Sequence, residues 1–264
     1  MDFSLVSLLT ALASGALIGL VLGLVGGGGS ILAVPLLVYL VGVPSAHTAI
    51  GTAAIAVALN AATSLAGHAR AGTVKWRCAA VFAAAGVVGA ALGAEAGKAI
   101  DGERLLALFG LLMIGVGASM LRKRKTVPQP DVRLTRETAP ALLPRLVPIG
   151  AGVGLLAGFF GIGGGFLIVP GLMLATAMPM TNAIGTSLVA VTALGLTTAS
   201  SYALSGYVDW TLAGVLVAGG VIGGLGGIRL GKRLSARKRV FELGFAGVVI
   251  AVGLYVVLKA ALNM

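Results

Sequence analysis

Charged residues are scarce in this chain of 264 residues, of which Asp, Glu, Lys and Arg together make up 10% and hydrophobic residues 58%. The mean hydropathy is +1.06. A soluble domain carries charge on about a quarter of its residues, which keeps its surface in water. Because this chain lacks such a surface, lipid must be its solvent. The composition excludes a soluble globular domain and predicts an integral membrane protein.

Cysteine and acidic residues are also rare. The single cysteine, Cys78, excludes an internal disulfide and a multi-cysteine metal site, and we interpret it as a small buried residue. No Asp or Glu lies firmly within an apolar segment, which disfavours a cation pump with a buried carboxylate pair. The sequence also offers no nucleophile–base pair and no cluster of metal ligands. We therefore expect no enzymatic activity, no cofactor and no metal.

Apolar segments make up most of the chain, and many approach the ~20 residues that cross a bilayer as a helix. We expect them near 6–25, 30–42, 48–68, 76–97, 104–121, 146–160, 163–176, 183–205, 210–228 and 240–260. Between the halves, 122–145 is basic and carries four prolines, which we expect to break any helix. The sequence thus predicts a first transmembrane repeat (1–121), a linker (122–145) and a second transmembrane repeat (146–264).

Three short blocks recur in the same order in both halves. Gly-Gly-Gly-Gly-Ser-Ile-Leu-Ala-Val-Pro at 26–35 matches Gly-Ile-Gly-Gly-Gly-Phe-Leu-Ile-Val-Pro at 161–170. Ala-Ile-Gly-Thr occurs at 49–52 and 183–186, and Gly-x-Val-x-Trp occurs at 72–76 and 206–210. The offset is constant within one residue, so each half is expected to be one copy of the same structural unit.

The basic residues predict how the two copies lie in the membrane. The net charge is +11, but the cations lie in short clusters between apolar segments, which disfavours nucleic-acid binding. The loops 70–77, 122–145 and 229–239 hold most of the lysines and arginines, so we expect all three to be cytoplasmic. An even number of crossings must then separate the loop 122–145 from the loop 229–239. Because 183–205 and 210–228 are single spans, 146–176 has to enter the membrane and return. Both termini become periplasmic and the repeats inverted. The alternative is eight simple spans in parallel repeats.

The short segments 30–42 and 163–176 reach only ~20 Å, less than the ~30 Å hydrocarbon core. We therefore expect two hairpins with glycine-rich tips at membrane depth, each presenting a helix N-terminus that attracts anions. The expected fold is an all-α polytopic membrane protein with two inverted-topology repeats, each a Gly-tipped helical hairpin plus three transmembrane helices. The competing interpretation is that the glycines form packing seams between helices.

Several polar side chains are candidates to line the same path. Ser30 adds a hydroxyl at one tip, Thr52, Thr186 and Ser187 lie early in the following helices, and Asn60 is an amide in mid-helix. Intramembrane Thr and Ser often bond their own helix instead. Two titratable residues, His47 and Glu95, are candidates for proton coupling, with interfacial positions as the alternative.

The paired glycine turns with downstream proline, the Ala-Ile-Gly-Thr blocks and the Gly-x-Val-x-Trp blocks resemble the sulfite exporter TauE/SafE family, also called the 4-toluene sulfonate uptake permease family. The resemblance covers about residues 12–258. It implies a bacterial inner-membrane transporter of small sulfur-containing or organic anions. The substrate region that it implies consists of Gly27, Gly28, Gly29 and Ser30 with Gly163, Gly164 and Gly165. In the first copy, Gly27 replaces the hydrophobic residue that Ile162 supplies in the second.

We therefore expect a secondary transporter of a small anion, such as sulfite, sulfoacetate or a related sulfonate. A passive anion channel and an importer of small carboxylates are the alternatives, because opposed half-helices also build pores. The expected partners are the anionic substrate and the lipid bilayer, without nucleic acid, and a homo-oligomer is left open.

Overall fold

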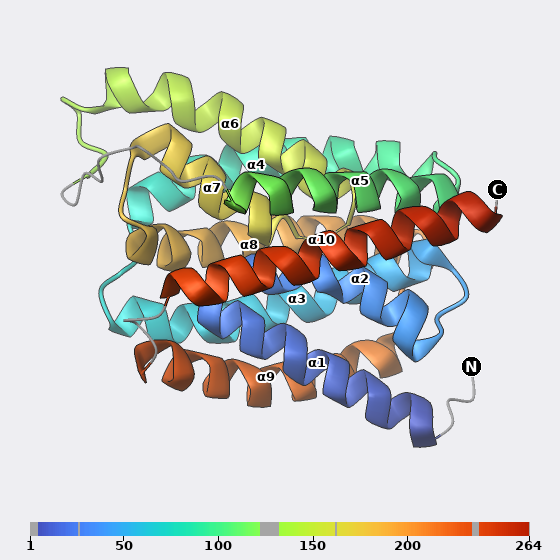
Figure 1. The fold of residues 1–264 in the computed structure, drawn as a ribbon. Coiled ribbons are helices and arrows are strands. Elements are labelled where there is room, and N and C mark those ends of the chain that lie inside the picture. Colours follow the sequence, from blue (N-terminus) through green and yellow to red (C-terminus); the bar gives the residue numbers. More distant parts are fainter. Residues whose placement is uncertain (1–4, 26, 122–131, 162, 234–237, 264) are drawn as a thin grey trace.

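The computed structural model describes residues 5–25, 27–121, 132–161, 163–233 and 238–263, and all regular structure within these ranges is helical (Figure 1). The long helices are α1 (Leu5–Val25), α3 (Ala46–Arg70), α4 (Trp76–Lys98), α5 (Gly102–Leu121), α6 (Ala139–Phe159), α8 (Met180–Leu204), α9 (Trp210–Arg233) and α10 (Lys238–Asn263). Within these ranges, eight helices are long and apolar enough to cross a membrane. The chain is a multi-pass membrane protein, and the all-helical prediction is confirmed.

Two short helical arms interrupt the series of spans. The first consists of η1 (Gly27–Leu32), α2 (Ala33–Pro35) and η2 (Leu36–Val41), and the second is α7 (Gly165–Thr176). The first arm packs against α1, and α7 packs against α6. Each half therefore begins with a long helix and a shorter apolar arm beside it, as the segment lengths predict.

The first arm changes its helical type along its length. It begins as a 3₁₀-helix, passes through one α-helical turn that ends at Pro35, and continues as a wider π-helix. Proline has no N–H to donate and its ring disfavours a regular α-helical bond at that point. The arm ends at Gly42, which adopts a left-handed conformation with φ of 84° and is the C-cap of η2. The glycine permits this ending without a Cβ clash.

One expectation about the linker is wrong. Helix α6 begins at Ala139, so the last seven residues of the range 122–145 are helical rather than broken by proline. Pro140 stands at the second position of the helix, where an N–H has no intrahelical partner to lose. Pro144 and Pro148 lie inside the helix and each removes one backbone donor from it. Residues 122–131 lie outside the described part of the chain.

The helices pair across the two halves in a matched way. Helix α1 packs along α9, and its counterpart in the second half, α6, packs along α4. Gly19 of α1 lies against the backbone of Gly220, and Gly154 of α6 lies against the backbone of Gly86. Glycines bring these helices into backbone contact, which is the common way in which membrane helices pack. Many glycines thus form packing seams, as the competing interpretation held.

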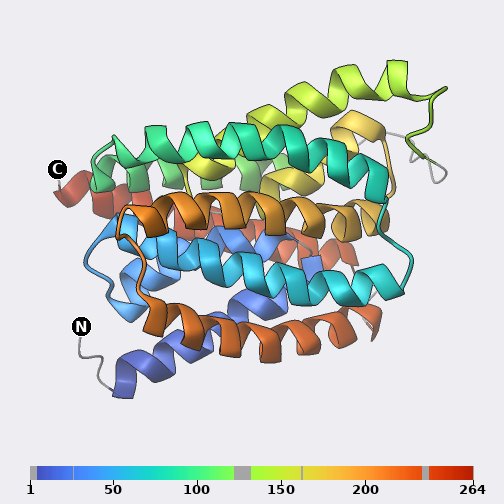
Figure 2. The same cartoon turned by 180° about the vertical axis from the view of Figure 1, so that it is seen from behind.

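The two central helices are α3 and α8. They lie side by side between α4 and α9 (Figure 2). In each of them, 67% of the span is buried within the protein, compared with 28% for α6 and α10. Helices α5 and α10 pack against each other. Helix α1 begins and α10 ends at one end of the bundle, whereas α5 ends and α6 begins at the opposite end (Figure 1).

Candidate functional site

The two glycine-rich tips meet inside the bundle. The first arm, through η1, packs against α7, and η1 also contacts the central helices α3 and α8. Helix α7 starts at Gly165, and its first hydrogen bonds run from the N–H groups of Leu167 and Ile168 to the Gly164 carbonyl. The N–H groups of Gly165 and Phe166 precede these bonds and lack partners within the helix. The structure thus brings together both glycine segments that the repeat analysis singled out. Gly26 and Ile162 lie outside the described residues.

The tip of the second hairpin requires glycine for its backbone. Gly163 and Gly164 have φ values of 61° and 68°, in the left-handed region that residues with a Cβ rarely adopt. A Cβ on Gly163 would lie 3.3 Å from Val57 Cγ1 of α3 and 3.5 Å from Gly195 Cα of α8. The turn is therefore fitted between the two central helices, with little space for a side chain.

The tip of the first hairpin is held against α1. A Cβ on Gly29 would collide with the carbonyl oxygen of Ile18 and lie 2.8 Å from the amide nitrogen of Leu22. Gly27 and Gly28 are the first two residues of the 3₁₀-helix that also contains Gly29. Ser30 is completely buried. The first tip therefore needs glycine for close packing, whereas the second needs it for its dihedral angles as well.

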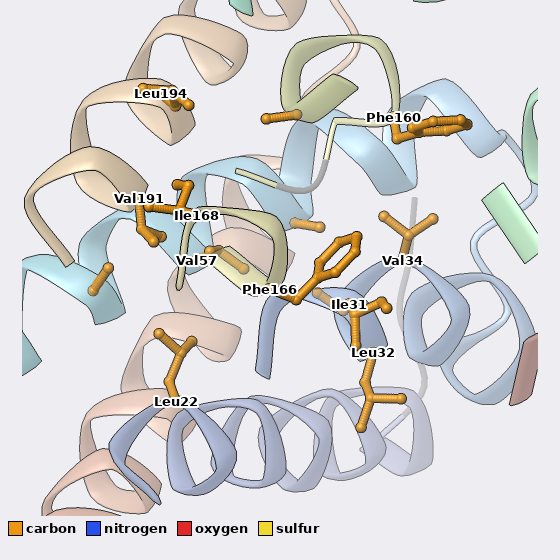
Figure 3. Close-up of a cluster of buried hydrophobic side chains, with 14 of the residues drawn as sticks. Leu22, Ile31, Leu32, Val34, Val57, Phe160, Phe166, Ile168, Val191 and Leu194 are labelled. Atoms are coloured by element: carbon orange, nitrogen blue, oxygen red, sulfur yellow. The ribbon is translucent and has the colours of Figure 1, made fainter. Parts of the chain in front are cut away.

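Apolar side chains surround both tips, which the sequence analysis did not predict. Ile31 and Val34 of the first arm belong to one buried cluster with Phe166 and Ile168 of α7 (Figure 3). The aromatic ring of Phe166 points toward the first arm (Figure 3). In the sequence, these apolar residues can be recognised because they directly follow each glycine run. In such surroundings, hydrogen bonds and helix dipoles act more strongly than in water.

Asn60 is the most informative polar residue of this region. Its side chain is only 1% exposed, and neither amide atom has a hydrogen-bond partner among the described residues. It lies against Gly220 on α9 and one helical turn beyond Val57, which faces Gly163. The equivalent position of the second repeat is Leu194, which packs on Gly86. A buried amide without partners costs about 1–3 kcal/mol, and a ligand that bonds it would offset that cost.

Three further buried hydroxyls have no partner among the described residues, and the sequence analysis missed them. They are Ser14 Oγ of α1, Thr198 Oγ1 of α8 and the phenol oxygen of Tyr202. Their signal in the sequence was a polar side chain within an apolar span. Thr198 is the repeat equivalent of Ser64, which is also buried. These groups add polar atoms to the interior without adding charge.

Thr52 and Thr186 occupy a different place from the hairpin tips. The Thr52 hydroxyl accepts a hydrogen bond from the backbone N–H of Asp209 at 3.0 Å, and Thr186 accepts one from Lys75 at 3.0 Å. Both threonines are fully buried. They therefore join the start of α3 to the loop before α9, and the start of α8 to the loop before α4.

These contacts explain two of the repeated blocks. Gly51 lies against the carbonyl oxygen of Tyr207, and Gly185 lies against Thr73. The Ala-Ile-Gly-Thr block of each half thus packs on the Gly-x-Val-x-Trp block of the other half. We call these two contacts the clasps. Ser187 is adjacent to one of them, and its hydroxyl donates to the Ile184 carbonyl of its own helix at 2.8 Å.

The two candidates for proton coupling lie near helix ends. The Glu95 side chain is 67% exposed, forms an ion pair with Lys98 at 2.8 Å, and accepts a hydrogen bond from Ser201 at 2.8 Å. His47 is half-buried, with its ring centroid 5.3 Å from that of Tyr207. Its Nδ1 atom is buried and has no partner among the residues that the structure describes. The His47 imidazole is therefore more enclosed than the Glu95 carboxylate.

Metal ligands do not gather in the described part of the chain, where no group of three His, Cys, Asp or Glu side chains could hold an ion. Cys78 is buried near the start of α4. The polar groups near the tips are backbone N–H groups, hydroxyls and one amide. This set can bind an anion by hydrogen bonds and offers no nucleophile poised by a base.

The apolar spans and the two short internal arms define the chain as a polytopic membrane protein. It belongs to the sulfite exporter TauE/SafE family, whose sequence pattern matches residues 11–256. This confirms the resemblance seen in the repeated blocks.

Curated relatives span nearly the same length. A probable membrane transporter protein of Xylella fastidiosa (strain Temecula1) is 49% identical over 254 residues, which cover 96% of each chain. The probable membrane transporter protein YunE of Bacillus subtilis (strain 168) is 29% identical over 86% of this chain and 89% of its own. The probable membrane transporter protein MJ0441 of Methanocaldococcus jannaschii is 25% identical over 92% and 93%. No solved structure matches the chain.

Proposed function

We propose that this protein is a secondary transporter that moves a small anion across the bacterial inner membrane. The anion is a sulfur oxyanion or an organosulfonate, such as sulfite or sulfoacetate. It binds where the glycine tips of the two short arms meet. The observation that carries this proposal is the unpartnered amide of Asn60, buried within a helical turn of the residue that faces Gly163. The family and the names of the relatives support a transporter.

The anion is held by partial charges in this proposal. The N-terminal N–H groups of α7 and of the first arm donate to it, because they lack partners within their own helices. The Asn60 amide donates two further N–H groups, and Ser30 adds a hydroxyl. Glycine at 27–29 and 163–165 lets the backbone approach the ligand closely. A site without a fixed countercharge releases its anion more readily than an ion pair does, as a transporter requires.

The other predicted site residues act indirectly in this proposal. Thr52 and Thr186 accept the hydrogen bonds of the two clasps, and the Ser187 hydroxyl bonds its own helix. They position the central helices whose side chains surround the substrate. His47 remains the better candidate for proton coupling, because the Glu95 carboxylate already has Lys98 and Ser201 as partners.

We further infer that the two halves are inverted repeats that rock against each other. The matched pairing of α1 with α9 and of α6 with α4 supports a pseudo-two-fold relation. The first and second halves begin at opposite ends of the bundle (Figure 1), which supports an axis in the membrane plane. The basic loops then place the linker in the cytoplasm and both termini in the periplasm.

The test is anion flux into proteoliposomes that contain the purified protein. We expect saturable uptake of ³⁵S-labelled sulfite, thiosulfate or sulfoacetate, and little uptake of acetate. Uptake of acetate alone would favour the carboxylate importer. Background uptake of every sulfur anion would contradict the proposal. Resolvable unitary currents in planar bilayers would favour the channel, although the apolar packing around the tips argues against an open pore.

The Asn60→Leu variant tests the site itself. Leucine branches at the same carbon as asparagine and occupies the equivalent position, Leu194, so we expect the variant to fold. A hydrogen bond to a charged group contributes about 1.5–3 kcal/mol, so uptake at low substrate concentration should fall about tenfold or more. The control is Thr63→Val, three residues away, whose hydroxyl bonds its own helix at 2.8 Å. Unchanged uptake by Asn60→Leu would place the site elsewhere.

A further inference from the structure

A second polar site lies at the end of the bundle where α3 ends and α4 begins. A cavity of about 490 Å³ opens there between the first turn of α4 and the segment that precedes α6. Lys75, Trp76 and Arg77 form one wall, and Arg133 and Thr135 form the other. The cavity is separate from the glycine tips, and the transport proposal does not use it.

The lining is strongly cationic. Three of the nine described lining residues are Lys or Arg, and none of these nine is acidic. Arg77 and Arg133 are exposed and Lys75 is half-buried. Three cations around one cavity give it a positive potential, which attracts an anion. The charge therefore calls for an anionic ligand with several acceptor oxygens.

The walls of the cavity are held in place by hydrogen bonds. Arg77 Nη1 donates to the Leu134 carbonyl at 3.3 Å, which ties the first turn of α4 to the opposite wall. The Thr138 hydroxyl donates to the Arg133 carbonyl at 2.7 Å, and its oxygen accepts from the Thr135 N–H at 2.9 Å. The backbone of Arg133 is therefore tied to the turn that precedes α6. Such preorganisation lowers the entropic cost of binding.

The first turn of α4 adds a favourable dipole. Lys75 is the N-cap residue of this 23-residue helix, and Ala79 is bonded to the Lys75 carbonyl. The N–H groups of Trp76, Arg77 and Cys78 thus precede the first intrahelical bond and have no partner within the helix. All three residues line the cavity. The positive end of the helix and the three cations attract the same negative charge.

Trp76 indicates where this cavity lies with respect to the membrane. Its side chain is 55% exposed although it is a large aromatic residue. It stands at the first residue of a membrane span, and tryptophan at such a position lies at the level of the lipid headgroups. A basic cavity at that level lies near the lipid phosphates.

We propose that this cavity binds the phosphate headgroup of an anionic phospholipid, such as phosphatidylglycerol. Lys75, Arg77 and Arg133 contact the phosphate, the first turn of α4 donates backbone N–H groups, and Trp76 packs against the glycerol and the upper acyl chain. Basic pockets beside membrane helices are known to take such headgroups. The proposal is independent of which anion the protein transports.

Lipid binding is tested by native mass spectrometry on the full-length protein in detergent, titrated with palmitoyl-oleoyl phosphatidylglycerol or phosphatidylcholine. We expect the wild type to retain phosphatidylglycerol in preference to phosphatidylcholine. Each basic residue near a lipid phosphate contributes about fivefold in affinity. The triple variant Lys75→Gln, Arg77→Gln, Arg133→Gln should therefore lose on the order of 100-fold of the affinity for phosphatidylglycerol.

Two further variants serve as controls. The triple variant Arg70→Gln, Arg104→Gln, Arg145→Gln removes the same charge from exposed residues that do not line the cavity, and should bind almost as the wild type does. The charge-preserving variant Lys75→Arg, Arg77→Lys, Arg133→Lys should keep binding within about tenfold. Equal losses in the cavity and control triples would overturn the proposal.

A soluble ligand is distinguished by competition. Inorganic phosphate or glycerol phosphate at millimolar concentration should neither displace phosphatidylglycerol nor match its effect on the melting temperature. Full displacement by either would assign the cavity to a soluble phosphate compound and overturn the lipid assignment. Transport by the triple variant Lys75→Gln, Arg77→Gln, Arg133→Gln is measured separately, in liposomes of phosphatidylcholine alone. Those liposomes contain no ligand for this cavity, so the measurement tests the transport proposal apart from lipid binding.

Discussion

At the scale of single residues, the two arms end differently although they are copies of each other. The first arm ends at Gly42 and the second at Ala177, and both residues have positive φ, 84° and 55°. Alanine pays a steric cost of roughly 1–2 kcal/mol in this region, which glycine avoids. The second arm therefore has a strained alanine at the position where the first arm has an unstrained glycine. The Ala177 N–H donates to the Met173 carbonyl, so the strained turn completes the helix end.

Ala177→Gly should stabilise the protein. The variant removes the Cβ from a left-handed position, and the gain, less the entropy added to the unfolded chain, is about 0.5–1 kcal/mol. The melting temperature in detergent should rise by about 2 °C. The reverse change, Gly42→Ala, meets no neighbour within 4 Å, so strain alone should lower the melting temperature. A fall on Ala177→Gly would show that this residue is not strained.

At the scale of elements, glycine determines how closely helices pack. A Cβ on Gly154 of α6 would lie 2.6 Å from Gly86 Cα of α4, and a Cβ on Gly89 would lie 2.8 Å from the Leu155 nitrogen. The contacting atoms belong to the backbone, so no side-chain rotation relieves the clash. The two helices can accept a larger residue only by moving apart.

Gly154→Ala should therefore destabilise the pair formed by α4 and α6. Overpacking of this kind costs about 1–3 kcal/mol, which lowers the melting temperature by several degrees. The matched control is Gly152→Ala on the same helix, where a Cβ meets nothing within 4 Å. That change should be neutral or stabilise by up to ~1 kcal/mol, because alanine favours the helix. Equal effects of both variants would mean that α4 and α6 are not in close backbone contact at Gly154.

At the scale of the whole molecule, the two clasps join the halves at opposite ends. Thr52 holds the loop before α9, and Thr186 holds the loop before α4. Each hydroxyl is the acceptor for a backbone N–H that leads into a membrane span. Loss of the acceptor leaves that donor unsatisfied, at a cost of about 1–3 kcal/mol.

Thr52→Val and Thr186→Val should each destabilise the protein, and the double variant should show the sum of both effects. Additivity is expected because the clasps share no residue and lie far apart. Thr63→Val and Thr197→Val are the controls, since those hydroxyls bond carbonyls of their own helices at 2.8 and 2.9 Å. Thermal unfolding in detergent measures all five variants. A double variant no worse than either single one would contradict two independent clasps.

Much of the fold could be predicted because it depends on local chemistry. Few charges and long apolar runs determine membrane insertion, and the length of 163–176 alone marks it as too short for a span. The paired blocks reveal the duplication without any knowledge of contacts. The helical start of 139–145 could not be predicted in the same way, because Pro140 at a helix start and Pro144 within a helix have the same local signature as a broken linker.

The sequence by itself determined that this chain lives in a membrane, that three short blocks recur in both halves, and that each half contains a short glycine-tipped arm. These properties follow from composition and spacing along the chain. Only the tertiary structure decided what surrounds those tips, what Thr52 and Thr186 bind, and that Asn60 is buried without a partner. Such facts depend on contacts between residues far apart in the chain. Tertiary packing determines those partners, and they cannot be deduced from local residue patterns.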